Sequence, residues 1–342
     1  MKAARLVDGE LGILDVPVPE PGLEEALVRI STSGVCHSDL HLAKGDWGSG
    51  GQIDALGHEA IGVVEALGPG ADRYAQVGDR VILGLGGTGG GYWCGACEWC
   101  LQGEQRHCAQ SQGIMGTFSE QFCVWAKSLV KLPDSVGDEQ APLACGALTA
   151  YGALKKLFRH NVTPGQWVAL VGAAGGLGHY AVQMAKALGY KVLGIDIGAE
   201  RLAFVDALGA DMVVSAEDAA KTVAAEIGGV SASIIFSAQM AGFKLGFRIL
   251  RPKGLFVAVG LPPLSEGKFE FSPFHFFALD ATVIYSAVGN VQDMREVVDM
   301  AASGQVATHI GRTGALSELE AIFDELGAGK YVGRAIIDDM AN

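Results

Sequence analysis

Short apolar runs recur through the second half of the chain and predict strands that alternate with helices. They lie at 167–171, 191–195, 212–214, 233–236, 255–259 and 281–285. Stretches with helix-like spacing of apolar residues separate most of them. Buried strands that alternate with helices are typical of a doubly wound parallel sheet, so we expect an α/β fold with six parallel strands in this region.

The first half of the chain has a different pattern. Short β-like runs, as at 26–30, 62–65 and 80–83, are separated by glycine and proline turn signals. We therefore expect a mainly β domain before the parallel sheet. After residue 285 the pattern predicts an amphipathic helix over 293–303 and a last strand over 333–337, which could complete either domain.

Composition narrows the classes of partner. The 342-residue chain is long enough for about two domains, and its formal net charge of −13, without a basic run, argues against a sequence-independent grip on nucleic acid. The N-terminus lacks the apolar core of a signal peptide, and no apolar run approaches the roughly 18 residues that span a bilayer. These features predict a cytoplasmic protein that acts on small molecules, with no nucleic-acid or membrane partner.

A glycine-rich turn follows the first strand of the predicted sheet and precedes a helix. Its residues are Gly172, Ala173, Ala174, Gly175, Gly176, Leu177 and Gly178. Glycines let a backbone approach a pyrophosphate, and a helix N-terminus offers free N–H groups and a positive dipole end. The context predicts a dinucleotide site, although Ala173 departs from the usual G-x-G-x-x-G pattern. A literal G-x-G-x-x-G at Gly84, Gly86 and Gly89 is not followed by a helical pattern.

Asp196 ends the second strand of the predicted sheet, twenty-one residues after Gly175. A carboxylate there can accept hydrogen bonds from the adenosine ribose hydroxyls, whereas a 2′-phosphate would meet its negative charge. The sequence therefore favours NAD over NADP. Arg201 lies close enough in sequence to weaken that preference.

Cysteine and histidine form two candidate metal groups. Four cysteines lie within fifteen residues, at Cys94, Cys97, Cys100 and Cys108, and predict a closed tetrahedral zinc site with a structural role. Elsewhere, Cys36, His58 and Cys145 offer two thiolates and one imidazole. Three ligands leave one position of a zinc ion open, and an open zinc acts as a Lewis acid on an alcohol oxygen. Cys123 belongs to neither group and is predicted to be a core residue.

Several motifs give the chain a resemblance to a known family. They are the four-cysteine segment, the glycine turn, and the segments 57–59, 78–81, 145–151, 193–196, 288–290 and 332–334. In these segments the chain resembles the zinc-dependent medium-chain alcohol dehydrogenases, particularly the short yeast-type and bacterial members. The resemblance implies a mainly β, GroES-like catalytic domain over 1–146 with a zinc lobe over 92–110. It implies an NAD-binding Rossmann domain over 147–285 and a segment over 286–342 that returns to the catalytic domain.

The resemblance also assigns roles around the metal. It makes Cys36, His58 and Cys145 the catalytic zinc ligands, the family's known set of two cysteines and one histidine. Glu59 would lie beside the metal, and Asp39 would orient His58 by accepting its other N–H. By the same resemblance, Ser38 would take the substrate proton, and His41 would relay it to solvent through the cofactor ribose. Trp47 and Leu85 would line the substrate pocket, although Leu85 stands where the family often has a tryptophan.

The cofactor residues follow from the same resemblance. Besides the glycine turn, Asp196 and Arg201, they are His37 and Arg334 at the pyrophosphate, with Thr149 and Val259 beside the nicotinamide. The resemblance implies two zinc ions per chain, one catalytic and one structural. It also implies a homotetramer, by analogy with the tetrameric microbial members of similar length.

The predicted function is a zinc- and NAD-dependent alcohol dehydrogenase of general specificity, which transfers hydride reversibly between a primary or secondary alcohol and NAD to give an aldehyde or ketone. An aldehyde reductase of cinnamyl or aryl type with a bulky substrate is an alternative. A polyol dehydrogenase is disfavoured, because such relatives usually have glutamate in place of the third ligand, and this chain keeps a cysteine there, Cys145. A zinc-free quinone reductase would have no use for either metal group. A non-catalytic zinc-binding protein of the same fold stays open.

Overall fold

A computed structural model describes residues 1–48, 54–84 and 90–342 of the chain. Contacts divide it into two compact units. The first unit joins Met1–Leu148 to Val288–Asn342, and the second unit is Thr149–Ala287. No helix in the described ranges is both long enough and apolar enough to cross a membrane.

The first unit is built on a seven-stranded sheet in the order β14-β15-β3-β4-β5-β7, with β6 pairing with β3 beside this path. Its strands, with the separate hairpin β1-β2, are β1 (Lys2–Val7), β2 (Glu10–Asp15), β3 (Glu25–Val35), β4 (Ala60–Leu67), β5 (Arg80–Leu83), β6 (Gln121–Trp125), β7 (Val130–Lys131), β14 (Ile310–Ala315) and β15 (Arg334–Asp339). Its helices are α1 (His37–Lys44), α2 (Glu98–Leu101), α9 (Val291–Ala302) and α10 (Leu319–Gly327). Helix α3 (Gly146–Arg159) begins in the first unit and continues in the second.

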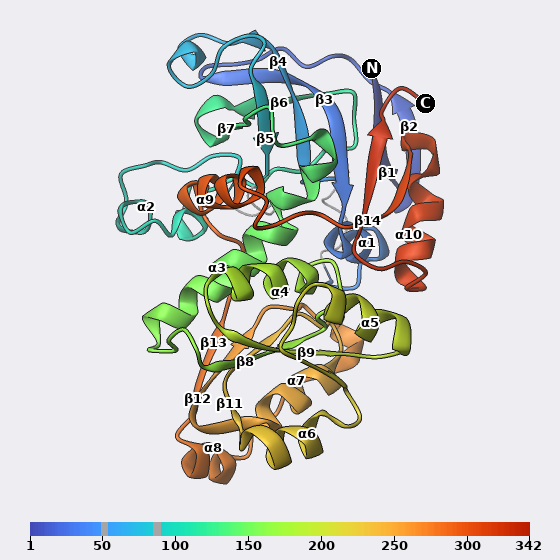
Figure 1. Cartoon of the computed structure of the whole chain (residues 1–342). Coiled ribbons are helices and arrows are strands. Elements are labelled where there is room, and N and C mark those ends of the chain that lie inside the picture. Colours follow the sequence, from blue (N-terminus) through green and yellow to red (C-terminus); the bar gives the residue numbers. More distant parts are fainter. Residues whose placement is uncertain (49–53, 85–89) are drawn as a thin grey trace. The chain divides into compact units, whose positions relative to one another are not determined.

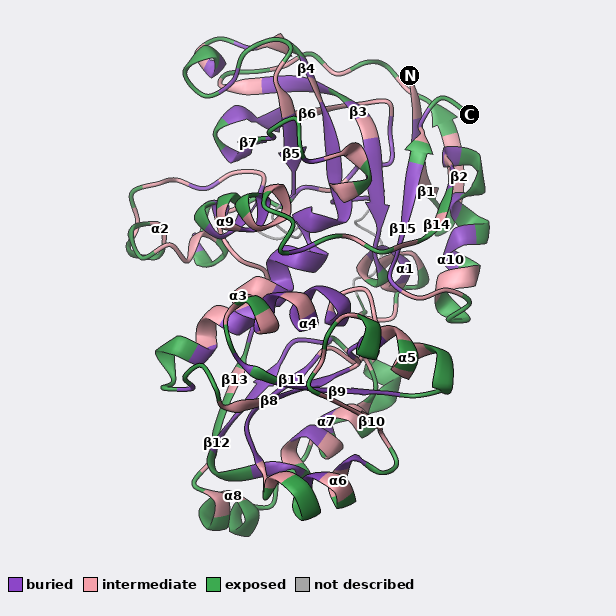
Figure 2. Ribbon diagram, viewed as in Figure 1, coloured by how far each residue is buried: buried purple, intermediate pink, exposed green. Residues whose placement is uncertain are grey.

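Strand β3 organises the first unit. It pairs antiparallel with β4, β6 and β15, and most of its residues are buried. The pairing of Ala335 with Val35 brings the C-terminal strand onto β3, so the segment after Ala287 completes this unit. The core contains buried aliphatic side chains from β3, β4 and α10, and Phe118. Burial is concentrated along these strands (Figure 2).

The second unit contains a six-stranded parallel sheet in the order β10-β9-β8-β11-β12-β13, as predicted. Its strands are β8 (Trp167–Val171), β9 (Lys191–Asp196), β10 (Met212–Ser215), β11 (Val230–Ile235), β12 (Leu250–Ala258) and β13 (Thr282–Tyr285). Its helices are α4 (Gly178–Ala187), α5 (Ala199–Ala207), α6 (Ala219–Thr222), α7 (Met240–Arg248) and α8 (Pro273–Leu279). Helices α4 and α5 cover one face of this sheet, and α6 and α7 cover the other (Figure 1). This is the doubly wound arrangement of the Rossmann fold, so the predicted fold class is confirmed.

The six strands differ in burial, and the difference follows their position. Central β8 and β11 are almost entirely buried, which explains why their sequences are near-continuous runs of apolar or small residues. Strand β13 lies at the edge, and three of its four residues are exposed, including Val283 and Tyr285. An apolar run in the sequence therefore does not by itself place a strand in the core.

Candidate active site

The open metal group predicted from the sequence is assembled inside the first unit. Ligand atoms of Cys36, His58, Glu59 and Cys145 all lie within 4.8 Å of one another, and all four residues are buried. Zinc in proteins takes ligands of these kinds at about 2.0–2.3 Å, so donors this close together fit one ion. Three of these residues are the predicted ligands, and Glu59 is the predicted neighbouring carboxylate.

Four points along the chain supply these side chains, and the sheet brings them together. Cys36 immediately follows β3, and His58 and Glu59 immediately precede β4. Because β3 and β4 are antiparallel neighbours that pair Ser33 with Ala60, the end of one strand lies next to the start of the other. Cys145 caps the 3₁₀ helix Asp138–Ala144, which packs against both strands.

Asp39 holds two of the candidate ligands from behind. Its Oδ1 atom lies 3.0 Å from Nδ1 of His58 and accepts a hydrogen bond of 2.9 Å from the backbone N–H of Gly57. Its Oδ2 atom accepts one of 3.2 Å from the backbone N–H of Cys36. The carboxylate is completely buried. This arrangement directs Nε2 of His58 away from Asp39, which suits that nitrogen to a metal.

Charge is distributed unevenly among the buried ligands. A hydrogen bond from Cys145 holds the pKa of the Cys36 thiol well below its ordinary value, although burial raises it, and His58 also lowers it. The same thiol–thiol hydrogen bond, with burial, holds the pKa of Cys145 well above its ordinary value. Burial lowers the pKa of His58, but the charge and hydrogen bond of Asp39 outweigh it and leave that pKa well raised. A metal cation that binds thiolates and a neutral imidazole would release these protons.

Glu59 is buried against Arg334. Its Oε2 atom forms a short ion pair with Nη2 of Arg334, which also donates a 3.0 Å hydrogen bond to the carbonyl oxygen of Val35. The Oε1 atom of Glu59 is buried without a hydrogen-bond partner among the described residues and lies 4.0 Å from Nε2 of His58. Burial raises the pKa of Glu59 to about 8, although the charge of Arg334 opposes it. Arg334 is only 3% exposed, so its predicted contact with a pyrophosphate stays a prediction.

Helix α1 contains the predicted proton-transfer residues. Ser38 is partly buried in its first turn, two residues after Cys36, and His37 at the helix start is exposed. The Nδ1 atom of His41 lies 2.7 Å from Oδ2 of Asp46, and the indole ring of Trp47 lies 4.9 Å from the His41 ring. Asp46 is not among the residues predicted from the sequence. Its signal was Gly45, because a glycine directly after a helix predicts a left-handed turn that folds the chain back.

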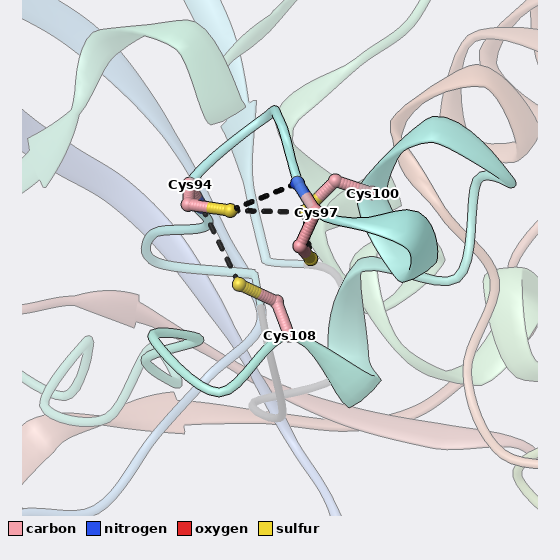
Figure 3. Close-up of side chains that lie close together, drawn as sticks. All are labelled: Cys94, Cys97, Cys100 and Cys108. Atoms are coloured by element: carbon pink, nitrogen blue, oxygen red, sulfur yellow. Dashed lines mark hydrogen bonds between the residues drawn. The ribbon is translucent and has the colours of Figure 1, made fainter.

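The four-cysteine group lies on a loop around α2, and its side chains point toward one another (Figure 3). The sulfur atom of Cys100 lies 3.5 Å from that of Cys97 and 3.9 Å from that of Cys94. Tetrahedral zinc with Zn–S bonds of about 2.3 Å requires sulfur atoms about 3.8 Å apart. The spacing therefore fits a zinc ion with four thiolate ligands, and no ligand position is left for a substrate.

Backbone groups and exposure distinguish this lobe from the buried group. Backbone N–H groups of Ala96 and Cys97 lower the pKa of the Cys94 thiol to about 6, whereas burial raises that of Cys100 to about 12. Cys94, Cys97 and Cys100 are only partly buried. Next to the lobe, Trp93 and Tyr92 pack their rings on Trp125 at 4.7 and 4.8 Å. These contacts give the two aromatic rings a packing role beside the lobe.

The glycine turn in the second unit forms a close cradle. Gly172 has φ +85°, a left-handed conformation that favours glycine, and a Cβ atom on Gly178 would approach the carbonyl oxygen of Gly172 to 2.1 Å. Asp196 accepts hydrogen bonds from the backbone N–H groups of Ala174 (2.8 Å) and Ile197 (2.9 Å). The structure therefore places the carboxylate at the end of β9 directly against the turn, where a dinucleotide fits the residues present.

The structure describes all but one of the remaining predicted residues. Arg201 on α5 approaches Asp196 at 3.9 Å, a separation at the limit of an ion pair. Thr149 on α3 and Val259 after β12 are buried in the second unit. Leu85 lies outside the described residues. Cys123 on β6 is only half-buried, so the prediction of a core residue holds in part, and burial raises its pKa to about 11.

Comparison with known proteins agrees with this geometry. Residues 22–134 match the alcohol dehydrogenase GroES-like domain, and residues 176–303 match the zinc-binding dehydrogenase domain. An alcohol dehydrogenase of Geobacillus stearothermophilus is 37% identical, with 96% of each chain covered. The crystal structure of the alcohol dehydrogenase from Aeropyrum pernix superimposes with a TM-score of 0.88 at 33% identity, covering 98% of this chain and 99% of that one. Acetophenone reductase from Geotrichum candidum in complex with NAD gives a TM-score of 0.85 at 27% identity, covering 100% and 98%.

The protein is thus an oxidoreductase that combines a GroES-like domain with a Rossmann domain. The chain belongs to the zinc-dependent medium-chain alcohol dehydrogenases, and the family predicted from its sequence is confirmed. Its relatives and the fold support alcohol dehydrogenase activity with NAD.

Proposed function

We propose that the protein reversibly oxidises primary or secondary alcohols to aldehydes or ketones with NAD. It would hold one catalytic and one structural zinc ion per chain. The observation that supports this most strongly is the buried convergence of Cys36, His58 and Cys145. When bound, the zinc supplies Lewis acidity that lowers the pKa of an alcohol, and NAD accepts the hydride.

The chain's own residues hold and orient these groups. Asp39 fixes the ring of His58, and the core around β3 and β4 excludes water from the ligands. Ser38, two residues beyond Cys36, accepts the proton of the substrate hydroxyl, and His41 passes it toward solvent. Trp47 lies against His41 and borders the substrate on that side.

The decisive experiment follows NADH absorbance while purified protein is offered NAD with short, long and aromatic alcohols, and reduced cofactor with the matching aldehydes. We expect turnover of at least one alcohol, abolished by a zinc chelator, and about two zinc ions per chain. Two bound zinc ions and bound NADH without turnover across the panel would instead support a non-catalytic protein or a specialised carbonyl substrate.

Cofactor choice tests the role of Asp196. The variant Asp196→Ala removes the carboxylate that lies against the glycine turn. The value of kcat/KM with NAD should then fall by about 10–100-fold relative to that with NADP, because a hydrogen bond to a charged group contributes a free energy of that size. Asp206→Ala, an exposed position on α5, serves as the matched control. An unchanged cofactor ratio in the Asp196 variant would mean that this carboxylate does not contact the ribose.

We also propose a cytoplasmic homotetramer. All seven cysteines lie outside disulfides, which suits a reducing compartment. Apolar side chains are exposed around the edge of the parallel sheet, notably Phe274 and Phe277 on α8 and Tyr285 on β13, and such residues support association between copies. Light scattering at assay concentration measures the mass of the assembly, and a monomer would contradict this part of the proposal.

A further inference from the structure

A sharp turn after α1 brings two side chains back onto His41. Gly45 adopts a left-handed conformation (φ 67°, ψ 21°), and its backbone N–H bonds to the last carbonyl oxygens of the helix. The N–H of Asp46 then donates to the carbonyl oxygen of His41 at 3.0 Å. Glycine adopts this conformation with less strain than other residues, so Gly45 favours the turn that places Asp46 and Trp47.

The two returning side chains contact different parts of the His41 ring. Asp46 lies 2.7 Å from Nδ1, and Trp47 lies against the ring at 4.9 Å with an interplanar angle of 39°. The His41 side chain is 12% exposed, and that of Asp46 is 30% exposed. The His41 side chain is therefore largely shielded from water, and the Asp46 carboxylate is the hydrogen-bond partner of Nδ1.

This contact selects one form of a neutral imidazole. An ionised carboxylate only accepts hydrogen bonds, so Nδ1 must carry the proton and Nε2 must present its lone pair. A carboxylate behind a catalytic histidine does the same in serine proteases, where it fixes the tautomer and orientation of the ring. A relay histidine that had the opposite tautomer would present an N–H where it must accept a proton.

We propose that Asp46 is the positioning residue of the proton relay: it holds His41 as the Nδ1–H tautomer, with Nε2 as the nitrogen that exchanges protons, while Trp47 fixes the ring plane. The proposal rests on the relay role of His41 given above. It assigns a function to Asp46, which is neither a candidate metal ligand nor part of the glycine turn.

The first test reads the tautomer directly and does not depend on turnover. The full-length, zinc-loaded chain is labelled with ¹⁵N-histidine, and solid-state NMR identifies the His41 signals by their loss in His41→Gln. We expect a protonated Nδ1 in the wild type. Asp46→Ala removes the acceptor, so the proton should no longer be held on Nδ1 and should shift toward Nε2, whereas Asp46→Glu should retain the wild-type signal. A wild-type spectrum in Asp46→Ala would overturn the proposal.

The second test asks whether Asp46 acts through His41. With an alcohol that the wild type oxidises, Asp46→Ala should lower kcat by about tenfold or more with little change in KM, and Asp46→Glu should recover much of the loss. The double variant Asp46→Ala/His41→Gln should be no slower than His41→Gln alone, because both changes disable one relay. Asp72→Ala, exposed in the 3₁₀ turn Ala71–Arg73, is the matched control and should be unchanged.

Failure of this inference differs from failure of the proposed function. A wild type that oxidises no alcohol contradicts the proposed function, and the NMR test still decides the tautomer. A wild type that turns over while His41→Gln or Asp46→Ala remains fully active overturns the relay assignment of Asp46. Additive losses in the double variant would equally overturn it, because they would give Asp46 a role independent of His41.

Discussion

The two metal-binding groups of the first unit are organised in opposite ways. The four cysteines of the lobe lie within fifteen residues, on a loop with short helical turns. The open group takes its ligands from positions 36, 58, 59 and 145, which only the pairing of β3 with β4 and the packing of the 3₁₀ helix bring together. One geometry is local in sequence, and the other is a product of the whole unit.

The surroundings of the two groups differ as much as their sequence spacing. Around α2 in the lobe, Leu101 is 75% and Trp99 41% exposed, so apolar burial contributes little on that side of the loop. At the open group, Cys36, His58 and Cys145 are each under 9% exposed, and Asp39 anchors two of them. We therefore expect the lobe to depend on a bound metal for its fold, whereas the protein core prepares the open group for a metal.

Removal of one ligand from the open group should give the largest effect. In Cys145→Ser, loss of the metal's transition-state stabilisation should lower kcat by about 10³-fold or more, while NADH binding and thermal stability stay close to the wild type. Steady-state kinetics, zinc content and NADH titration measure these outcomes. Cys123→Ser, outside both groups, is the control. Retained turnover in Cys145→Ser would contradict its assignment as a ligand.

Removal of one ligand from the lobe should have the converse effect. Cys100→Ala leaves three thiolates and a loop with little core, so we expect loss of one zinc ion and a decrease in unfolding free energy on the order of several kcal/mol. Turnover per folded molecule should stay near the wild-type value. Thermal unfolding and zinc content are compared with those of Cys123→Ala. Full stability with abolished turnover would reverse the roles of the two groups.

The same contrast explains what could be predicted from the sequence. The lobe can be predicted because its four ligands lie close together in the sequence. The glycine turn can be predicted because a buried strand and a helix flank it. The pairing of Glu59 with Arg334, 275 residues apart, has no local signal, since it depends on the register of β15 against β3. The contact of Asp46 with His41 is local, but the sequence does not reveal it, because a glycine after a helix predicts a turn without fixing which side chain returns to the helix.

Strand boundaries show a similar limit. The apolar run at 233–236 marked only the end of β11, which begins at Val230, because Ser231, Ala232 and Ser233 are small residues buried in a crowded central strand. Strand β12 begins at Leu250, five residues before the predicted run, since the exposed residues Arg251, Pro252 and Lys253 separate the buried Leu250 from that run. Hydrophobicity identified the buried parts of these strands, and the backbone pairing set their ends.

The smallest of the predicted effects should separate the two metal groups without removing a ligand. Asp39→Asn replaces one accepting oxygen by an amide N–H group, which opposes either the Cys36 N–H or the donors from Gly57 and His58. Because such partners orient the metal ligands, zinc affinity at the open group should fall by about 10–100-fold and that of the lobe should not change. Competition with a chelator, followed for both zinc ions and compared with the exposed Asp134→Asn, gives the two affinities. If both affinities fell together, the buried carboxylate would support the whole unit rather than one group, and the division between a locally built and a globally built site would not hold.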